Sequence, residues 1–235
     1  MPPIDTCLEL VRQQILTAEQ THGRVPGSVQ LLAVSKTRHA AEIGEALQAG
    51  QRRFGESYLQ EALEKIDLLR DRGIEWHFIG RIQSNKTRAI AENFHWVHSI
   101  DKVKQARRLN DQRPDNLQPL NICLQIMVDR EESKGGLSAA EAEGLVGQIE
   151  DFPRLRLRGL MTLPAPSDDL ENQRKPFRAL RLLRDSLATP QTPLETLSMG
   201  MSDDLEAAIA EGATIVRVGT AIFGPRKLEV CPKNP

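Results

Sequence analysis

The sequence predicts a single-domain α/β fold in which eight parallel strands close into a (β/α)8 barrel of the TIM type. Short apolar runs alternate regularly with amphipathic helical segments along the chain. Such alternation is typical of a parallel sheet, because each crossover needs a helix. Eight such runs are present, which is the number of strands that closes a barrel. No break in composition along the 235 residues indicates a second domain. The alternative is an open, doubly wound sheet, which usually has fewer strands at this length.

An extra helix, over about residues 3–22, is expected in front of the barrel. Ile4, Leu8, Val11 and Ile15 recur there at helical spacing among polar residues. This pattern differs from that of a signal peptide. The barrel itself is expected over about residues 30–226, and a short C-terminal tail follows it.

The eight strands are expected at the apolar runs, which are too brief for helices and suit strands buried on both faces. In order, these runs are 31–35, 53–55, 76–79, 96–100, 120–128, 155–160, 194–199 and 213–218. Helices are expected between them, where apolar residues recur every three or four positions. Those segments are 40–49, 59–72, 84–92, 101–112, 137–149, 177–187 and the residues around 205–209. Gly50 and Gly73 follow the first two of these helices and are typical helix stops.

Composition and charge exclude several classes of protein. Lys and Arg number 31 against 32 Asp and Glu, a net charge of −1, whereas nucleic-acid binding needs a surplus of clustered basic residues. No apolar run approaches the ~20 residues that a membrane span needs. The three cysteines, Cys7, Cys123 and Cys231, are odd in number and far apart, which favours reduced thiols over disulfides. We therefore expect a cytoplasmic protein, a monomer, that binds neither nucleic acid nor membrane.

Lys36 is the first candidate functional residue, because function in a parallel barrel lies where strands end and loops begin. It ends the first predicted strand, and strand parity places it on the same face as Leu32 and Val34. A desolvated lysine has a lowered pKa and can act as a Schiff-base nucleophile. The alternative is a side chain that merely extends along apolar surface to solvent.

A phosphate site is expected after the seventh and eighth strands, the usual place for one in such barrels. Residues 198–204 follow the seventh strand and open a helix, where backbone N–H groups and the helix dipole can bind an anion. After the eighth strand, Gly219 permits close backbone approach and Thr220 offers a hydroxyl. The alternative for the first loop is that Ser202 or Asp203 simply caps the helix.

A phosphate site beside a lysine on the neighbouring strand suggests pyridoxal 5′-phosphate as the cofactor. Arg217 lies two residues before Gly219 on the same strand face, and pyridoxal phosphate sites carry an Asp or Arg partner at the pyridine nitrogen. Because arginine stays protonated, it would disfavour a protonated ring nitrogen and weaken the cofactor as an electron sink. This favours a binding protein over an enzyme.

Seven motifs in order along the chain resemble those of the pyridoxal phosphate homeostasis protein family. They are residues 33–37, 54–58, 77–80 with 83–86, 132–134, 158–161, 198–204 and 217–224. The resemblance runs from about residue 4 to residue 226. It departs from the family at Ser57, where an asparagine is usual, and at Arg81, where a proline or histidine is usual.

The resemblance implies a barrel of the alanine-racemase type that holds the cofactor as an internal aldimine on Lys36. It implies phosphate contacts from Ser202, Gly219 and Thr220, with Arg217 near the ring nitrogen. We also place Ser57, His77 and Met201 among the cofactor-binding residues; the alternative for His77 is a hydrogen-bonded core histidine. No residue is assigned a catalytic role and no metal is expected.

Three functions remain open. The family resemblance implies a carrier that maintains vitamin B6 and amino-acid balance, without established catalysis, and delivers pyridoxal phosphate to apo-enzymes. The second function is a small racemase-like enzyme with Lys36 as its base. Racemases with this barrel add a β domain that supplies a tyrosine base, whereas this chain ends soon after Gly224 and has one tyrosine, Tyr58. The third is a sugar-phosphate enzyme that uses Lys36 without any cofactor.

Overall fold

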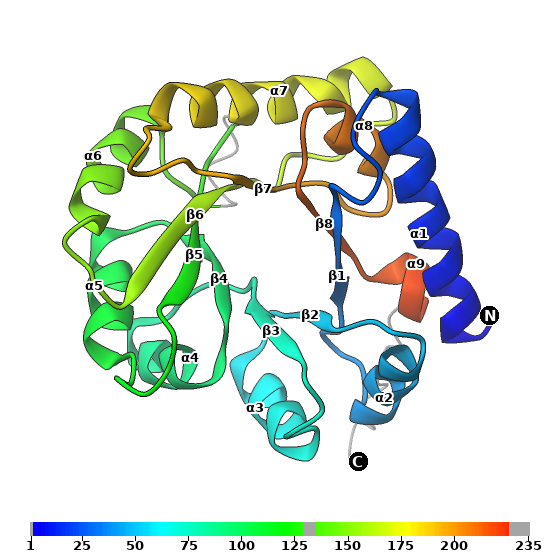
Figure 1. Ribbon diagram of the computed structural model, residues 1–235, viewed down its shortest axis with the longest axis horizontal. Coiled ribbons are helices and arrows are strands. Elements are labelled where there is room, and N and C mark those ends of the chain that lie inside the picture. Colours follow the sequence, from blue (N-terminus) through cyan, green and yellow to red (C-terminus); the bar gives the residue numbers. More distant parts are fainter. Residues whose placement is uncertain (1, 129–134, 226–235) are drawn as a thin grey trace, which may run out of the picture.

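The chain forms a closed barrel of eight parallel strands with helices around it, as the computed structural model shows for residues 2–128 and 135–225 (Figure 1). Each strand pairs with its neighbours in chain order, and β8 pairs with β1 to close the sheet. The strands are β1 (Gln30–Val34), β2 (Arg53–Glu56), β3 (Glu75–Phe78), β4 (Trp96–Ile100), β5 (Leu120–Gln125), β6 (Leu155–Met161), β7 (Thr196–Ser198) and β8 (Ile215–Val218). The predicted barrel is confirmed, and the open sheet is excluded.

The helices cover the outside of the barrel, and α1 lies against α8 and α9 (Figure 1). They are α1 (Ile4–Thr21), α2 (Ala40–Gln48), α3 (Leu59–Leu68), the short 3₁₀ helix η1 (Ser84–Lys86), α4 (Thr87–Asn93), α5 (Val103–Gln112), α6 (Ala139–Ile149), α7 (Leu170–Leu187), α8 (Leu205–Ala210) and α9 (Thr220–Phe223). Each helix expected from the sequence is present. The expected N-terminal helix corresponds to α1, which packs on the barrel.

Some boundaries differ from the prediction for local reasons. The strand expected over 194–199 is confined to Thr196–Ser198, because Leu194 has a φ of 47°, which a strand residue does not adopt. Helix α7 begins at Leu170, seven residues before Phe177, since the Asp169 side chain caps it by accepting from the N–H of Asn172 at 2.8 Å. The short α9 was not expected from the sequence.

The hydrophobic core lies between the sheet and the helices. Outward-facing strand residues such as Phe54, Phe78 and Val97 are at most 2% exposed and belong to one apolar cluster with the buried faces of the helices. The ring of Phe78 packs edge-on against Phe94 of the following segment, with centroids 5.3 Å apart. Packing of these side chains against the helices holds the strands, and with them the strand ends, in place.

The barrel interior, by contrast, contains polar side chains as well as apolar ones such as Leu32. Strands β4 and β7 are not neighbours in the sheet, yet His98 Nδ1 and Ser198 Oγ lie 2.8 Å apart. Side chains from such distant strands can meet only across the interior, because alternate residues of each strand point inward. His77 and Arg217 are further buried polar residues on inward-facing positions.

Three predicted features lie outside the described residues: the motif at 132–134, Cys231 and the tail after Pro225. Cys7 and Cys123 are buried free thiols. Burial raises the pKa of Cys123 to about 12, so this thiol stays protonated at neutral pH. None of the helices in the described ranges combines the length and the apolar character that crossing a membrane demands.

Candidate functional site

The ends of β1 and β8 bring two of the predicted site segments together. Leu32 is the register partner of Arg217 and Ala33 that of Val218, so Gly219 lies beside Val34. A Cβ on Gly219 would stand 3.2 Å from the carbonyl oxygen of Val34 and 3.3 Å from its Cβ. Gly219 therefore packs closely on Val34, two residues before Lys36. The close approach of its backbone to a phosphate stays a prediction.

Lys36 lies in the turn after β1 rather than in the strand itself, and it is half-buried. The next residue, Thr37, has a φ of 65°, in the left-handed region that non-glycine residues rarely adopt. The N–H of Thr37 donates to Glu61 Oε1 at 2.6 Å, and the carbonyl oxygen of Ser35 accepts from Lys65 Nζ at 2.7 Å. Side chains from α3 thus hold the backbone on both sides of Lys36.

These contacts belong to a buried cluster of charges that we call the α3 clamp, formed by Glu56, Glu61 and Lys65. Lys65 is 4% exposed; its Nζ lies 2.8 Å from Glu56 Oε1 and also contacts Glu61 Oε1. The hydroxyl of Ser35 donates to Glu56 Oε1 at 2.6 Å. Desolvation raises the pKa of Glu56, although Lys65 opposes this. Within the described chain, Glu56 Oε2 is buried without a hydrogen-bond partner.

The α3 clamp was not predicted from the sequence. One signal was present: Lys65 follows Ala62 by three residues and precedes Leu69 by four, so it falls on the apolar face of its helix. A lysine at such a position needs a buried partner.

Arg217 projects into the barrel interior and is 3% exposed. Its Nη1 donates to Ser198 Oγ and its Nη2 donates to the carbonyl oxygen of Thr162, both at 2.8 Å. Burial lowers the pKa of Arg217 to about 10, so the guanidinium is still charged at neutral pH. Among the described residues, these bonds use two of its five N–H groups.

The loop after β7 runs beside β8, because the backbone N–H of Arg217 donates to the carbonyl oxygen of Gly200 at 2.9 Å. Gly200 has a φ of 92°, and a Cβ there would lie 2.5 Å from the Cβ of Ala208, so only glycine fits. The N-cap of α8 is Asp204, whose Oδ1 accepts from the N–H of Met201 at 2.5 Å. The alternative in which Ser202 or Asp203 caps this helix is therefore wrong.

Ser202 and Thr220 lie on the two loops that follow β7 and β8. Ser202 is half-buried and lines a groove between α1 and α8, and Thr220 is the first residue of α9 and is exposed. Met201 is 39% exposed beside Ser202. The two loops start side by side, since Gly200 is bonded to Arg217.

Ser57 and His77 occupy different levels of the barrel. Ser57 follows β2 and packs so closely on Gly80 that a Cβ on Gly80 would lie 2.1 Å from its carbonyl oxygen. His77 is fully buried inside the barrel, with Nε2 2.8 Å from Glu75 Oε1 and Nδ1 2.9 Å from His98 Nε2. Its ring stacks on Trp96 with centroids 5.4 Å apart. These contacts make His77 a hydrogen-bonded interior histidine.

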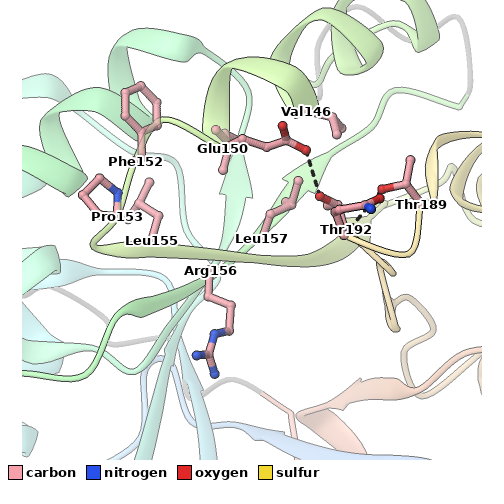
Figure 2. A pocket seen from close by; sticks show the side chains of 11 residues that line it. Val146, Glu150, Phe152, Pro153, Leu155, Arg156, Leu157, Thr189 and Thr192 are labelled. Atoms are coloured by element: carbon pink, nitrogen blue, oxygen red, sulfur yellow. Dashed lines mark hydrogen bonds between the residues drawn. The ribbon is translucent and has the colours of Figure 1, made fainter.

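A cavity of about 620 Å³ lies at the opposite end of the barrel (Figure 2). It is lined by the end of α6, the start of β6 and the segment before β7, where the hydroxyl of Thr192 donates to Glu150 Oε1 at 3.1 Å. None of the predicted site residues lines it. Lys36, Ser202 and Gly219 instead follow the carboxyl ends of β1, β7 and β8, where barrels of this type carry their functional sites.

Metal ligation finds no support in the part of the chain that the structure describes, where His, Cys, Asp and Glu form no group of three or more that could hold an ion. The chemistry available at the candidate site is that of an amine, a buried guanidinium and backbone N–H groups with hydroxyls. Such a donor set suits an anionic ligand that also carries a carbonyl group.

Comparisons with known proteins identify relatives over most of the chain. The model of the alanine racemase N-terminal domain matches residues 8–227. A pyridoxal phosphate homeostasis protein of Pseudomonas aeruginosa is 55% identical over 216 residues, which cover 92% of this chain and 93% of that protein. The Escherichia coli K12 protein of the same name is 50% identical over 222 residues, covering 93% and 95%. The structure of PipY from Synechococcus elongatus PCC7942 with PLP bound has a TM-score of 0.80 and 37% identity, covering 89% of this chain and 100% of PipY. The chain therefore belongs to the pyridoxal phosphate homeostasis protein family, built on the alanine racemase N-terminal domain.

Proposed function

We propose that this protein binds pyridoxal 5′-phosphate and acts in the homeostasis of that cofactor, and with it of vitamin B6 and amino acids, rather than in catalysis. The observation that carries the proposal is the contact between Gly219 and Val34, which sets the loop after β8 beside the turn that holds Lys36. Relatives over most of the chain are named for pyridoxal phosphate homeostasis, and PipY has been solved with PLP bound.

The chain offers a residue for each group of the cofactor. The N–H groups of residues 219 and 220, at the start of α9, and the hydroxyls of Ser202 and Thr220 would hold the phosphate. The guanidinium of Arg217 would face the ring nitrogen. The aldehyde would condense with Nζ of Lys36, forming a carbon–nitrogen double bond and releasing water, with no further reactant.

Arg217 supports binding without turnover. With its pKa at about 10, the guanidinium is positive at neutral pH and disfavours a second positive charge on the ring nitrogen. A ring nitrogen without a proton withdraws electrons poorly, which slows reactions at a substrate α-carbon. The same guanidinium would still bind and orient the ring.

Ser57, Met201 and His77 are the remaining predicted cofactor-binding residues, and they lie at different distances from the rim of the barrel. Ser57 and Met201 lie on loops after β2 and β7 and would contact the cofactor from the rim. His77 lies deeper and would act through the side chains between it and Arg217. We further propose that the chain is one domain, that it works as a monomer in the cytoplasm, and that apo-enzymes receive the cofactor from it.

An absorption titration of the purified protein with pyridoxal phosphate tests the binding. We expect a yellow protein that binds one equivalent, loss of the yellow band in Lys36→Ala, and an unchanged band in Lys86→Met, an exposed lysine in η1. A colourless protein that takes up no cofactor would contradict the proposal and favour a cofactor-free sugar-phosphate enzyme. Steady turnover of D- or L-amino acids that is lost in Lys36→Ala would favour the racemase-like enzyme instead.

A further inference from the structure

A continuous series of hydrogen bonds, which we call the interior chain, crosses the barrel from Arg217 to Glu75. Arg217 Nη1 lies 2.8 Å from Ser198 Oγ, which lies 2.8 Å from His98 Nδ1. His98 Nε2 lies 2.9 Å from His77 Nδ1, and His77 Nε2 lies 2.8 Å from Glu75 Oε1. The three middle residues are fully buried, and Glu75 is 39% exposed at its side chain near the amino end of the barrel.

The two ends of the interior chain fix its direction. Arginine can only donate, so Ser198 Oγ accepts from it and has its own hydrogen left to give to His98 Nδ1. At the other end, the hydrogen bond from His77 lowers the pKa of Glu75, so this carboxylate is ionised and can only accept. His77 therefore carries its hydrogen on Nε2.

The two histidines between these ends are neutral. Desolvation lowers the pKa of His77, which Glu75 opposes and which Arg53 and His95 reinforce. Desolvation also lowers the pKa of His98 well below its usual value, and the neighbouring His77 and Arg217 lower it further. A neutral His77 with its hydrogen on Nε2 accepts at Nδ1, so His98 also carries its hydrogen on Nε2. One arrangement of hydrogens satisfies every link.

We propose that the interior chain is a positioning device for Arg217, in which every hydrogen points away from the guanidinium and toward Glu75. Glu75 then acts as the anchor at the far end, because its ionised carboxylate selects the tautomer of His77. Through His98 and Ser198, this choice presents an oxygen lone pair to Arg217 Nη1. The guanidinium is held in one orientation before any ligand enters.

That this orientation serves the ring nitrogen of pyridoxal phosphate rests on the proposed function. In a reversed interior chain, His98 would carry its hydrogen on Nδ1 and donate it to Ser198 Oγ. The serine hydrogen would then be displaced, which would disturb the contact with Arg217. Loss of the acceptor at position 75 is the change that permits this reversal.

The first test needs no cofactor. Long-range ¹H–¹⁵N NMR of the full-length protein without cofactor distinguishes the two tautomers of each imidazole. We expect the hydrogen on Nε2, with no hydrogen on Nδ1, for both His77 and His98 at pH 7. Glu75→Gln keeps an acceptor oxygen and should retain these tautomers. Glu75→Leu has no acceptor and should have the hydrogen on Nδ1 of both rings. Arg53→Met is the matched control, since it removes another partner of Glu75 and leaves every link in place. An Nδ1–H on either ring of the wild-type protein would overturn the proposal.

The second test uses the bound cofactor. Ser198→Ala removes the acceptor of Arg217 Nη1 and leaves that of Nη2, the carbonyl oxygen of Thr162. We expect the absorption maximum of bound pyridoxal phosphate to shift and its Kd to rise about tenfold. Cys123→Ala is the control, because this buried residue lies near Arg217 and is not part of the interior chain. An unchanged spectrum and Kd in Ser198→Ala, or an equal change in Cys123→Ala, would overturn the positioning role. Failure of the wild-type protein to bind the cofactor would instead contradict the proposed function, with the NMR result still standing.

Discussion

At the scale of single residues, the candidate site depends on buried charged groups that are held by hydrogen bonds. Lys36 is carried on a left-handed turn at Thr37, and the α3 clamp holds that turn through Glu61 and Lys65. Arg217 is held in the same way by Ser198 and Thr162. Removal of one partner from such a set lowers the free energy of unfolding more than removal of both, because no partner then offsets the lost hydration of the remaining buried charge.

The substitution Lys65→Met should lower the free energy of unfolding by about 3–5 kcal/mol, since it leaves Glu56 buried opposite an apolar side chain. Urea unfolding measures this. The double variant Lys65→Met with Glu56→Gln should be more stable than the single variant, because both charges are then gone. Lys86→Met, at an exposed lysine, should stay within about 0.5 kcal/mol of wild type. A single variant as stable as wild type would show that the clamp contributes nothing to the fold.

His98 should make stability depend on pH. Its pKa in the folded protein is well below the ordinary value of 6.5. Below pH 6.5 the imidazole therefore binds a proton in the unfolded chain but not in the folded chain. Stability should therefore fall as the pH decreases from 6.5, by up to about 1.4 kcal/mol per pH unit from this residue. Urea unfolding of wild type and His98→Asn between pH 7 and 5 should show a smaller slope in the variant. Equal slopes of the free energy of unfolding against pH in the two proteins would contradict a neutral His98 in the folded protein.

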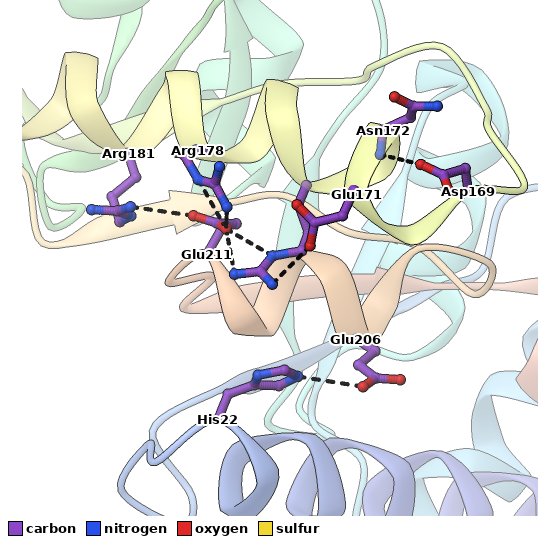
Figure 3. A network of polar contacts seen from close by, with 9 residues as sticks. His22, Asp169, Glu171, Asn172, Arg178, Arg181, Glu206 and Glu211 are labelled. Atoms are coloured by element: carbon purple, nitrogen blue, oxygen red, sulfur yellow. Dashed lines mark hydrogen bonds and ion pairs between the residues drawn. The ribbon is translucent and has the colours of Figure 1, made fainter.

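At the scale of elements, α7 and α8 are joined through Glu211, which follows α8 and is 3% exposed at its side chain (Figure 3). Three arginines of α7 surround its carboxylate, with N–O distances of 2.8 Å for Arg174, 2.9 Å for Arg178 and 3.2 Å for Arg181. Burial would raise the pKa of Glu211, but the hydrogen bonds from these arginines outweigh it and lower the pKa. The carboxylate thus fastens the helix that precedes the eighth strand.

Glu211→Gln should destabilise the protein by about 1–3 kcal/mol at pH 7, a range reduced for the partial exposure of the arginines. Because the folded pKa is lowered, this stabilisation is present above the ordinary value of 4.5 and is lost as the pH falls through the folded pKa. The matched control is Glu171→Gln, an exposed partner of Arg174, expected to change stability by less than about 0.5 kcal/mol. Equal effects of the two substitutions in thermal unfolding would argue against the central role of Glu211.

Close packing of the loops after β2 and β3 depends on Gly80. An alanine there would place its Cβ 2.1 Å from the carbonyl oxygen of Ser57, so the two loops must separate. Gly80→Ala should cost about 1–3 kcal/mol and weaken cofactor binding at the rim. Gly144→Ala in α6 meets nothing within 4 Å and should instead add about 0.5–1 kcal/mol through helix propensity. Calorimetry of both variants checks the contrast, and a neutral Gly80→Ala would refute it.

At the scale of the whole molecule, closure of the barrel explains which parts of the site the sequence could predict. Apolar runs located the strands, and closure makes β1 the neighbour of β8, so the sequence could predict that Lys36 and Gly219 follow adjacent strands. The α3 clamp and the interior chain escaped prediction. Both are made of polar side chains from separate elements, such as His98 and Ser198, whose contact across the interior leaves no periodic pattern in the sequence. The short α9 escaped because four residues carry no periodicity.

Peptide mass spectrometry, after the protein has been incubated with pyridoxal phosphate and reduced with borohydride, tests directly whether Lys36 holds the cofactor. Hydride converts a carbon–nitrogen double bond into a stable secondary amine, so the label remains on the lysine that held the cofactor. We expect a reduced pyridoxyl group on the peptide that contains Lys36. A label on another lysine with Lys36 unmodified, or no label on the chain, would contradict it.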